Sequence, residues 1–311
     1  EMTSSLVGSE MCIRDRGWND SFALMGKRFN YTVSATLGDN LTEITKYNNS
    51  EKKLTDYYEG MKLGEIWGYR VDGLFASDEE AAEYTSKINQ DFVNARILSD
   101  KVEPYYRAGD LKFRDLDGDN IISKGDDTAY DAGDREIIGN ETPRYMYSFR
   151  LGADWNGIDL GIFFQGVGKR DWYPNYLSTG FWGPYSRAFT SFIPENFMDQ
   201  CWSEENPGGY FPRFRGYQTF KDSQLGVNND RYLQDASYIR LKNLTVGYTL
   251  PVLKKVFTKL RVYFTGENLW YWSPMKKYTK YIDPEAAGGN GNTGMAYNYS
   301  RNFSVGVDIT F

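Results

Sequence analysis

The sequence predicts an all-β fold: about seven strands of a large transmembrane antiparallel β-barrel with long extracellular loops. The first observation is the final stretch, 297–311, in which apolar and polar residues alternate. A period of two places six apolar residues on one face of a strand: Tyr299, Phe303, Val305, Val307, Ile309 and Phe311. Arg301 is the one exception on this face. The stretch covers the roughly 9–11 residues that a tilted strand needs to cross a bilayer. Aromatic residues at both ends of its apolar face are typical of an interfacial girdle.

The second observation is the composition. The 311 residues include 25 Tyr, 19 Phe, 8 Trp and 31 Gly, which suits strands with aromatic girdles and glycine turns. The sequence contains no run of about 18 apolar residues, so it does not predict a transmembrane helix. The net charge of -6 argues against a nucleic-acid partner. The chain has no His, the commonest general base and metal ligand, and its 2 Cys give no disulfide framework.

The first segment, 1–16, is set aside from the fold prediction as an artefactual, adaptor-derived segment. Residues 6–16 resemble a translated transposon adaptor from sequencing libraries, which encodes Met-Cys-Ile-Arg-Asp-Arg, as at 11–16. On this interpretation Cys12 is not native and the natural protein begins upstream of about Gly17. The alternative is a short polar N-terminal segment.

The next stretch predicts a strand pair and then a long loop. Residues 17–25 form a weak strand, Gly26-Lys27 a turn, and 28–38 a clearly alternating strand. The loop, about 39–144, contains an extended segment at 66–75. It also contains a short helix that runs from Ser77-Asp78 to about residue 90, with a residue type that caps helices at its start.

The second half of the chain predicts four more strands and closes with the last one. Residues 145–155 and 158–166 alternate on either side of Asn156-Gly157, the strongest short hairpin signal. A second loop, about 168–235, leads to a strand at 236–250, which Pro251 ends. A short connection at 251–259, a strand at 260–272 and a third loop at 273–296 precede the final strand.

The connections alternate between short and long, and this favours a barrel over a soluble sandwich. Outer-membrane barrels have short periplasmic turns and long extracellular loops. If Phe311 ends in the periplasm, every short turn falls on the periplasmic side. Seven strands are fewer than a closed barrel needs, so we expect the chain to be part of one.

An acidic stretch in the first loop, 115–126, resembles a calcium-binding loop. The expected oxygen ligands are Asp115, Asp117, Asp119, the Ile121 carbonyl, Ser123 and Asp126. Asn120 stands where the pattern has glycine, and position 12 is Asp rather than Glu. The alternative is an acidic turn in solvent.

Aromatic residues of the second loop are candidates for contact with a sugar or a partner: Trp172, Tyr173, Trp182, Tyr185 and Trp202. The alternative is that they pack the loop against itself. A glycosidase-like acid pair is not distinguished, because the inward-facing Asp154, Asp159 and Asp308 fit a polar lumen as well.

Several segments together resemble the SusC/RagA-like TonB-dependent outer-membrane transporters. They are Gly109–Ser123, Ile137–Pro143, Phe163–Gly166, Tyr238–Pro251, Gly266–Leu269 and Gly64–Phe75. The match covers nearly all of 17–311 in the family's order, so this range is identified as a partial TonB-dependent-receptor barrel.

The resemblance implies a barrel of about 22 strands with an N-terminal plug, of which this chain is the C-terminal portion without the plug or TonB box. It implies import of oligosaccharides or peptides across the outer membrane of a Gram-negative bacterium, and no enzyme activity. The implied partners are a SusD-like surface lipoprotein, TonB and the barrel-assembly machinery, which would read the final strand as an insertion signal. Two other hypotheses remain: a secreted β-sandwich that binds glycan, and a glycoside hydrolase domain.

Overall fold

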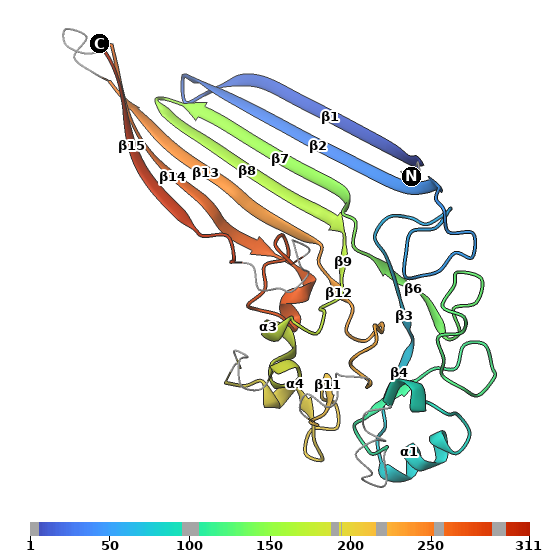
Figure 1. Ribbon diagram of the computed structural model, residues 1–311. Coiled ribbons are helices and arrows are strands. Elements are labelled where there is room, and N and C mark those ends of the chain that lie inside the picture. The colour runs from blue at the N-terminus through green and yellow to red at the C-terminus, as the bar shows by residue number, and fades with distance from the viewer. Residues whose placement is uncertain are drawn as a thin grey trace.

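One large antiparallel sheet dominates the structure, a computed structural model (Figure 1). It describes residues 6–94, 106–187, 193, 195–215, 223–251, 258–287 and 297–311, without the side chains of 6–11. The seven strands follow one another in the order β1-β2-β7-β8-β13-β14-β15. Their bounds are Leu6–Leu24, Lys27–Lys46, Arg144–Trp155, Ile158–Lys169, Tyr238–Leu250, Lys259–Trp272 and Asn302–Thr310. The expected seven strands are therefore all present.

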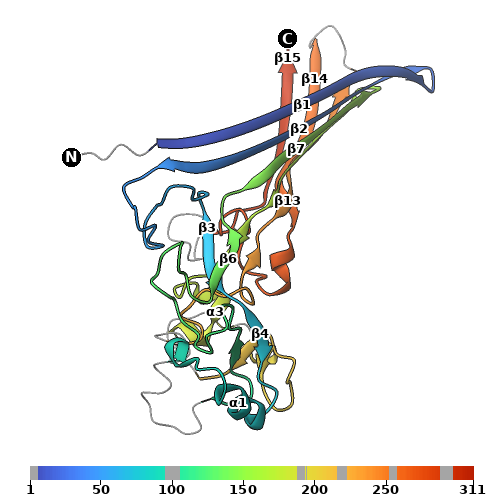
Figure 2. The same cartoon turned by 90° about the vertical axis from the view of Figure 1, so that its right-hand side faces the viewer.

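The sheet is strongly twisted and open. Figure 2 shows β1 and β15, its two edge strands, running in clearly different directions. A right-handed twist between neighbouring strands is the norm, and in a long sheet it accumulates into the curvature of a barrel wall. The described part of the chain thus has the shape of a segment of wall.

The long connections all leave the sheet at one end and form a cap, and the short turns lie at the other end (Figure 1). This confirms the segregation that the connection lengths predicted. The cap contains the strands β3 (Glu65–Tyr69), β4 (Val71–Leu74), β5 (Leu111–Phe113), β6 (Arg135–Asn140), β9 (Asp171–Trp172), β10 (Cys201–Trp202), β11 (Phe211–Arg213) and β12 (Gln234–Asp235). Its helices are α1 (Asp78–Thr85), η1 (Asp91–Asn94), α3 (Thr179–Trp182), α4 (Pro184–Arg187), η2 (Met198–Gln200) and η4 (Pro274–Lys277). Among the described residues, no helix is long and apolar enough to cross a membrane.

The turns follow from residues that tolerate positive φ. Asn156 and Gly157 have φ of 51° and 86°, so the predicted hairpin turn is confirmed. The first turn consists of Met25 and Gly26, with φ of 49° and 72°, rather than Gly26-Lys27. The prediction was one residue out, because it placed the glycine first instead of second.

Several predicted boundaries also differ. β2 extends to Lys46 rather than Gly38, because residues 39–46 pair with the start of β1. α1 stops at Thr85, well short of residue 90. Its start is as expected, since the Ser77 hydroxyl accepts a hydrogen bond of 3.1 Å from the Glu80 amide. Six of the residues in the connection 251–259 lie outside the described residues.

The apolar residues of the strands share one face, and that face is exposed. Its members on β7, β8, β13, β14 and β15 include Phe149, Leu151, Ile158, Leu160, Val246, Tyr248, Val262, Phe264, Trp270, Trp272, Phe303, Val305, Val307 and Ile309. Exposure reaches 76% at Val305. A soluble sandwich would bury this face against a second sheet, and no described element covers it. A lipid-facing wall needs such a surface.

The strand β1 breaks this pattern inside the adaptor-like segment. Arg14 pairs with Leu37 and Arg16 with Ala35, while Trp18 pairs with Val33. Directly paired residues share a face, so the two arginines lie on the apolar side. An arginine on the lipid face costs about 2–4 kcal/mol at the membrane midplane. The structure continues β1 through residues 6–16, but their pattern does not suit a membrane wall.

Candidate functional site

The polar face of the sheet carries a charge cluster near the short turns. Arg261 of β14 lies 2.6 Å from Asp159 of β8 and 2.9 Å from Asp308 of β15. It reaches Asp159 across β13 because the intervening residue is Gly247, where an added Cβ would stand 2.6 Å from the arginine Nε. Asp154 accepts a hydrogen bond of 2.8 Å from Asn30. The three inward aspartates are thus held in wall contacts, as a polar lumen would have them.

The cap has an aromatic core built from all three long loops. It joins, among others, Ile66 and Phe113 from the first loop, Trp182 and Phe211 from the second, and Ile282 from the third. Ring contacts run through it, such as Trp182 with Tyr232 at 5.1 Å between centroids. The described parts of the three long loops therefore pack as one unit.

The five aromatic residues that were candidates for ligand contact lie inside the cap. Trp172, Tyr173, Trp182, Tyr185 and Trp202 are exposed by 1%, 7%, 0%, 0% and 7%. The Tyr185 hydroxyl donates to the Pro212 carbonyl at 2.6 Å, and Arg213 stacks on Trp202 at 4.6 Å. In this structure their side chains are buried in the cap, and contact with a sugar or a partner stays a prediction. The alternative of loop packing is the one observed, because an aromatic side chain gains more from burial than from exposure.

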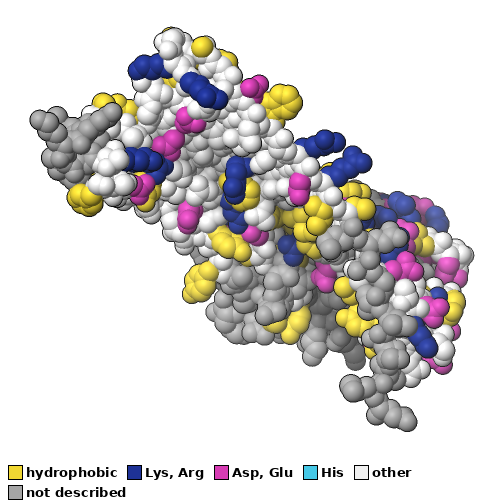
Figure 3. Space-filling view, turned by 90° about the horizontal axis from the view of Figure 1, so that it is seen from above, with side chains coloured by type: hydrophobic (Ala, Val, Ile, Leu, Met, Phe, Trp, Pro, Cys, Tyr) yellow, Lys and Arg dark blue, Asp and Glu magenta, His cyan; other side chains and the backbone are white. Residues whose placement is uncertain are grey.

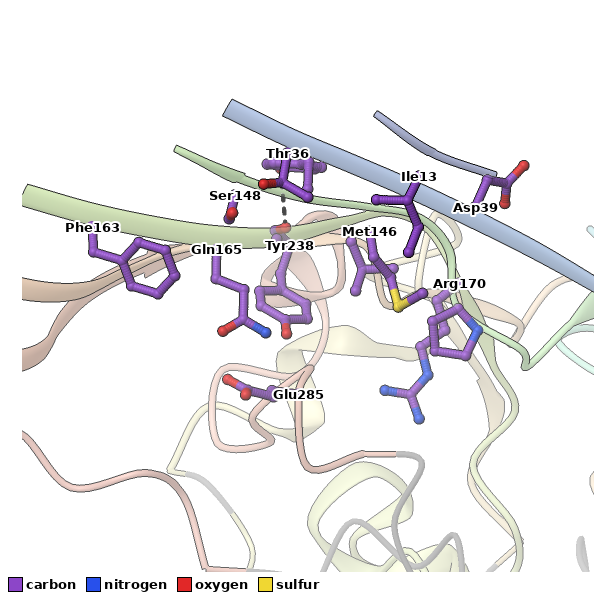
Figure 4. Close-up of a pocket in the computed structure, with 15 residues that line it drawn as sticks. Ile13, Thr36, Asp39, Met146, Ser148, Phe163, Gln165, Arg170, Tyr238 and Glu285 are labelled. Atoms are coloured by element: carbon purple, nitrogen blue, oxygen red, sulfur yellow. Dashed lines mark hydrogen bonds between the residues drawn. The ribbon is translucent and has the colours of Figure 1, made fainter. Parts of the chain in front are cut away.

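A hollow of about 520 Å³ lies between the polar face of the sheet and the third loop. Polar side chains from the wall line it (Ser148, Gln165, Tyr238), together with Arg170 and Glu285 at the cap side. Figure 4 shows Gln165 and Tyr238 extending from the sheet toward Glu285, with Arg170 to one side. Apolar residues complete the lining, among them Met146, Phe163 and Val167. A concave site with an apolar lining and a few convergent polar groups is what small ligands bind.

The acidic loop has the geometry that its sequence predicted at its start. Asp115 accepts hydrogen bonds from the amides of Gly118 and Asn120, at 2.7 and 2.9 Å. Asn120 has φ of 66°, so it occupies the glycine position of the pattern in the left-handed conformation. The loop therefore turns tightly, which fits both the calcium loop and the acidic turn in solvent.

The carboxylates that come together are Asp115, Asp117 and Asp134, whose oxygens lie within 4.8 Å of one another. This spacing fits the 2.3–2.6 Å bonds of calcium to oxygen ligands. Asp126, the expected position 12, is not in this group, and neither is Asp119. Asp134 was missed because a 12-residue template ends before it. Its neighbours hold it in place, since its two oxygens accept hydrogen bonds from the amides of Leu116 and Ser123.

Burial raises the pKa of Asp134, and the neighbouring Asp117 and Asp115 carboxylates raise it further. A cation between the three carboxylates would offset both effects. The donor set is all oxygen, which suits a hard cation such as calcium.

These features define a class of protein. A twisted antiparallel wall with an apolar outer face, a polar inner face and all long loops at one end is part of a transmembrane β-barrel with a capped mouth.

Comparison with known proteins finds similar TonB-dependent receptors. No family model matches the chain. It is 30% identical over 217 residues to TonB-dependent receptor P26 of Formosa agariphila, covering 65% of this chain and 20% of that protein. It is 26% identical over 336 residues to TonB-dependent receptor P39 of the same organism, covering 96% of this chain and 30% of that protein. The chain thus spans less than a third of these relatives.

Solved structures agree on the fold. The RagAB peptide transporter superposes with a TM-score of 0.62 at 20% identity, over 97% of this chain and 29% of that one. The RagAB peptide importer in its closed-closed state gives 0.62 at 21% identity, over 98% and 30%. The chain is therefore similar in sequence to part of the TonB-dependent receptors, and in fold to part of the RagAB transporter.

Proposed function

We propose that the chain forms part of the wall and mouth of an outer-membrane importer of peptides or oligosaccharides in a Gram-negative bacterium. The observation that carries this is the one-ended cap over a wall with an apolar outer and a polar inner face (Figure 1). The relatives are named receptors and the similar structures transporters, which supports transport rather than covalent chemistry.

The same proposal includes the partners. TonB supplies energy through the part of the protein outside this chain, a SusD-like lipoprotein covers the mouth, and the barrel-assembly machinery inserts the wall. Support for such a partner comes from the likeness in fold to the RagAB peptide transporter. A nucleic-acid partner is not part of the proposal, because the net charge is -6 and basic and acidic side chains are interspersed on the face in Figure 3.

The test is uptake by the intact bacterium. The gene is deleted, and cells are offered a labelled peptide mixture or labelled oligosaccharides at limiting concentration. We expect one of the two uptakes to fall to the level of a strain without TonB, and to return when the gene is restored. Unchanged uptake of both would contradict the proposed function.

The lipoprotein is tested separately. The intact, affinity-tagged transporter is purified from outer membranes in mild detergent, and the product of the adjacent lipoprotein gene is sought by mass spectrometry. Co-purification at a constant ratio supports the partner. Its absence, with the barrel itself intact, would remove the lipoprotein from the proposal.

The secreted β-sandwich is the second candidate, and the exposed outer face speaks against it. Burying apolar side chains is the main stabilising contribution to a soluble fold, yet Phe303, Val305 and Val307 are more than half exposed. A soluble, monomeric intact protein in the culture medium would favour the sandwich.

A further inference from the structure

The third loop is fastened to the inner face of the wall by buried charges. Arg240 of β13 pairs with Asp283, and its Nε lies 3.0 Å from the Glu285 carboxylate. Lys242, two residues along the strand, lies 2.8 Å from the same Glu285. Arg240 and Asp283 are each only 1% exposed. Charged side chains are almost never buried to this extent unless they are paired.

Aromatic rings enclose the arginine. The Arg240 guanidinium carbon lies 4.7 Å from the centroid of Tyr271 and 5.1 Å from that of Tyr299. Lys242 lies 4.6 Å from the Tyr299 centroid. These rings come from both sides of the third loop, Tyr271 at its start and Tyr299 at its end. The cations of β13 therefore hold the loop at its middle and contact it at its two ends.

A third cation of the wall contacts the same loop segment. Arg170, which follows β8, donates a hydrogen bond of 3.3 Å to the Pro284 carbonyl. The segment 283–285 is thus bound by Arg240 and Lys242 of β13 and by Arg170, which directly follows the neighbouring strand β8.

The same loop is also joined to the cap. Met275 and Ile282 belong to the aromatic core. Tyr278 stacks on Tyr210 of the second loop, with centroids 3.5 Å apart and the rings nearly parallel. The segment 275–285 therefore connects the cap core to the inner wall, and movement of the cap against the wall would have to break the charged contacts.

This connecting segment also forms one side of the hollow. Glu285 and Arg170 line it opposite Gln165 and Tyr238, as Figure 4 shows. Glu285 is oriented by Lys242, whose ammonium reaches both of its carboxylate oxygens at 2.8 Å. The pairing on β13 thus decides where the far side of the hollow lies.

We propose that Arg240 is a positioning residue of the import path: it fixes the segment 283–285 on the inner wall, so that the segment 275–285 is a permanent strap that shapes the hollow at the mouth. The strap's effect on import rests on the proposed function, but its anchoring does not. Buried ion pairs are poor sources of net stability, whereas removing one partner leaves an uncompensated charge. The ion pairs of Arg240 with Asp283 and Glu285 favour one position of the loop, whereas apolar contacts would allow several positions.

The anchoring is tested by protease treatment of whole cells that express the intact transporter. Lys277 and Lys280 are exposed trypsin sites in the third loop. Arg240→Met leaves Asp283 buried and unpaired, so we expect cleavage at these sites to be about tenfold faster or more. The matched control is Arg261→Met, which removes an arginine with two carboxylate partners from the same face at the opposite end of the wall. Cleavage of the control should match the wild type.

A second variant covers the case in which Arg240→Met fails to reach the membrane. Glu285→Gln removes one charge from the loop side and leaves the strand unchanged, and we expect cleavage to be faster by a smaller factor. Arg240→Lys keeps the charge at the same place and should restore part of the protection. Wild-type cleavage rates in both Arg240→Met and Glu285→Gln, with the proteins present in the membrane, would overturn the proposal.

The effect on import is read from concentration dependence. We expect Arg240→Met to raise the substrate concentration for half-maximal uptake at least severalfold, with a smaller change in the maximal rate per transporter. Faster cleavage with unchanged half-maximal concentration would overturn the positioning role. If the wild type imports neither peptides nor oligosaccharides, the proposed function fails. The cleavage rates would still test whether Arg240 anchors the segment 283–285.

Discussion

At the scale of single residues, Gly109 shows how the cap depends on one missing side chain. Its φ is 85°, a conformation that other residues rarely adopt. A Cβ at this position would stand 2.3 Å from a ring carbon of Trp202. Trp202 is itself held in place by Arg213, which stacks on its ring at 4.6 Å. Gly109 therefore permits both the positive φ of the backbone and the close approach of the Trp202 ring.

We expect Gly109→Ala to destabilise the cap by about 2–4 kcal/mol, from the left-handed backbone and from overpacking together. The measurement is hydrogen exchange of peptides covering 106–113 in the intact transporter, which should become much faster. Gly60→Ala is the control, because Gly60 has φ of 91° but nothing within 4 Å of an added Cβ. Equal effects of the two substitutions would show that the contact with Trp202 is unimportant.

The acidic loop gives a second prediction for single residues, in which the structure and the sequence template disagree. We predict that the intact transporter binds calcium through Asp115, Asp117 and Asp134. Asp134→Asn should weaken binding by about tenfold or more, because a site with fewer charged ligands binds calcium less tightly. Asp126→Asn should leave it nearly unchanged. Calorimetric titration after removal of metals measures both.

If Asp126→Asn weakened calcium binding more than Asp134→Asn, the ligand set of the 12-residue calcium-loop pattern would be the correct one. A flat titration of the wild type would remove calcium altogether. The template could not have found Asp134, because only folding brings position 134 beside 115 and 117. A spacing rule describes one continuous loop, here 115–126, whereas Asp134 lies beyond the end of that loop.

At the scale of elements, the strands were predictable and the cap was not. An alternating strand such as 145–155 carries its own signal, since each residue's face follows from its position. The Asn156-Gly157 turn is equally local. The cap core instead joins Ile66, Trp182 and Ile282, each from a different loop. No local period links them, so the aromatic residues of the second loop could be read as a ligand surface.

The last strand, β15, is the element for which the sequence predicts a separate role. Its residues Phe303, Val305, Val307 and Ile309 alternate on the outer face, and the Phe303 and Phe264 rings stack at 6.1 Å. With Phe311 they form the predicted signal for insertion into the outer membrane. We expect Phe311→Ala in the intact protein to lower its outer-membrane level severalfold, measured as heat-modifiable barrel on gels.

The control for this prediction is Tyr297→Ala, which removes an exposed aromatic residue just before the strand. A normal level of folded barrel for Phe311→Ala would mean that the terminal aromatic residue has no part in assembly. A loss in both variants would point to a general effect of aromatic residues rather than to a signal at the end of the chain.

At the scale of the whole molecule, the residues on the outer face indicate which strands suit a membrane wall. It is continuous from β15 to β2, and it becomes charged where β1 enters the adaptor-like segment at Arg16 and Arg14. Two arginines near the middle of a lipid-facing strand would together cost several kcal/mol. The other six strands of the wall keep apolar residues on this face, so nothing in the wall accounts for two arginines on β1.

We therefore predict that the uninterrupted gene, read from source DNA in long single reads, does not encode Met-Cys-Ile-Arg-Asp-Arg before Gly17. At the positions of Arg14 and Arg16 we expect apolar or small residues, continuing the face of Trp18 and Phe22, with polar residues between them. The alternation matters as well as the loss of charge, because a strand of this length must keep one face in lipid and one in the lumen. A native gene with both arginines in place would contradict the prediction, and the outer face would then have to contact protein rather than lipid at β1.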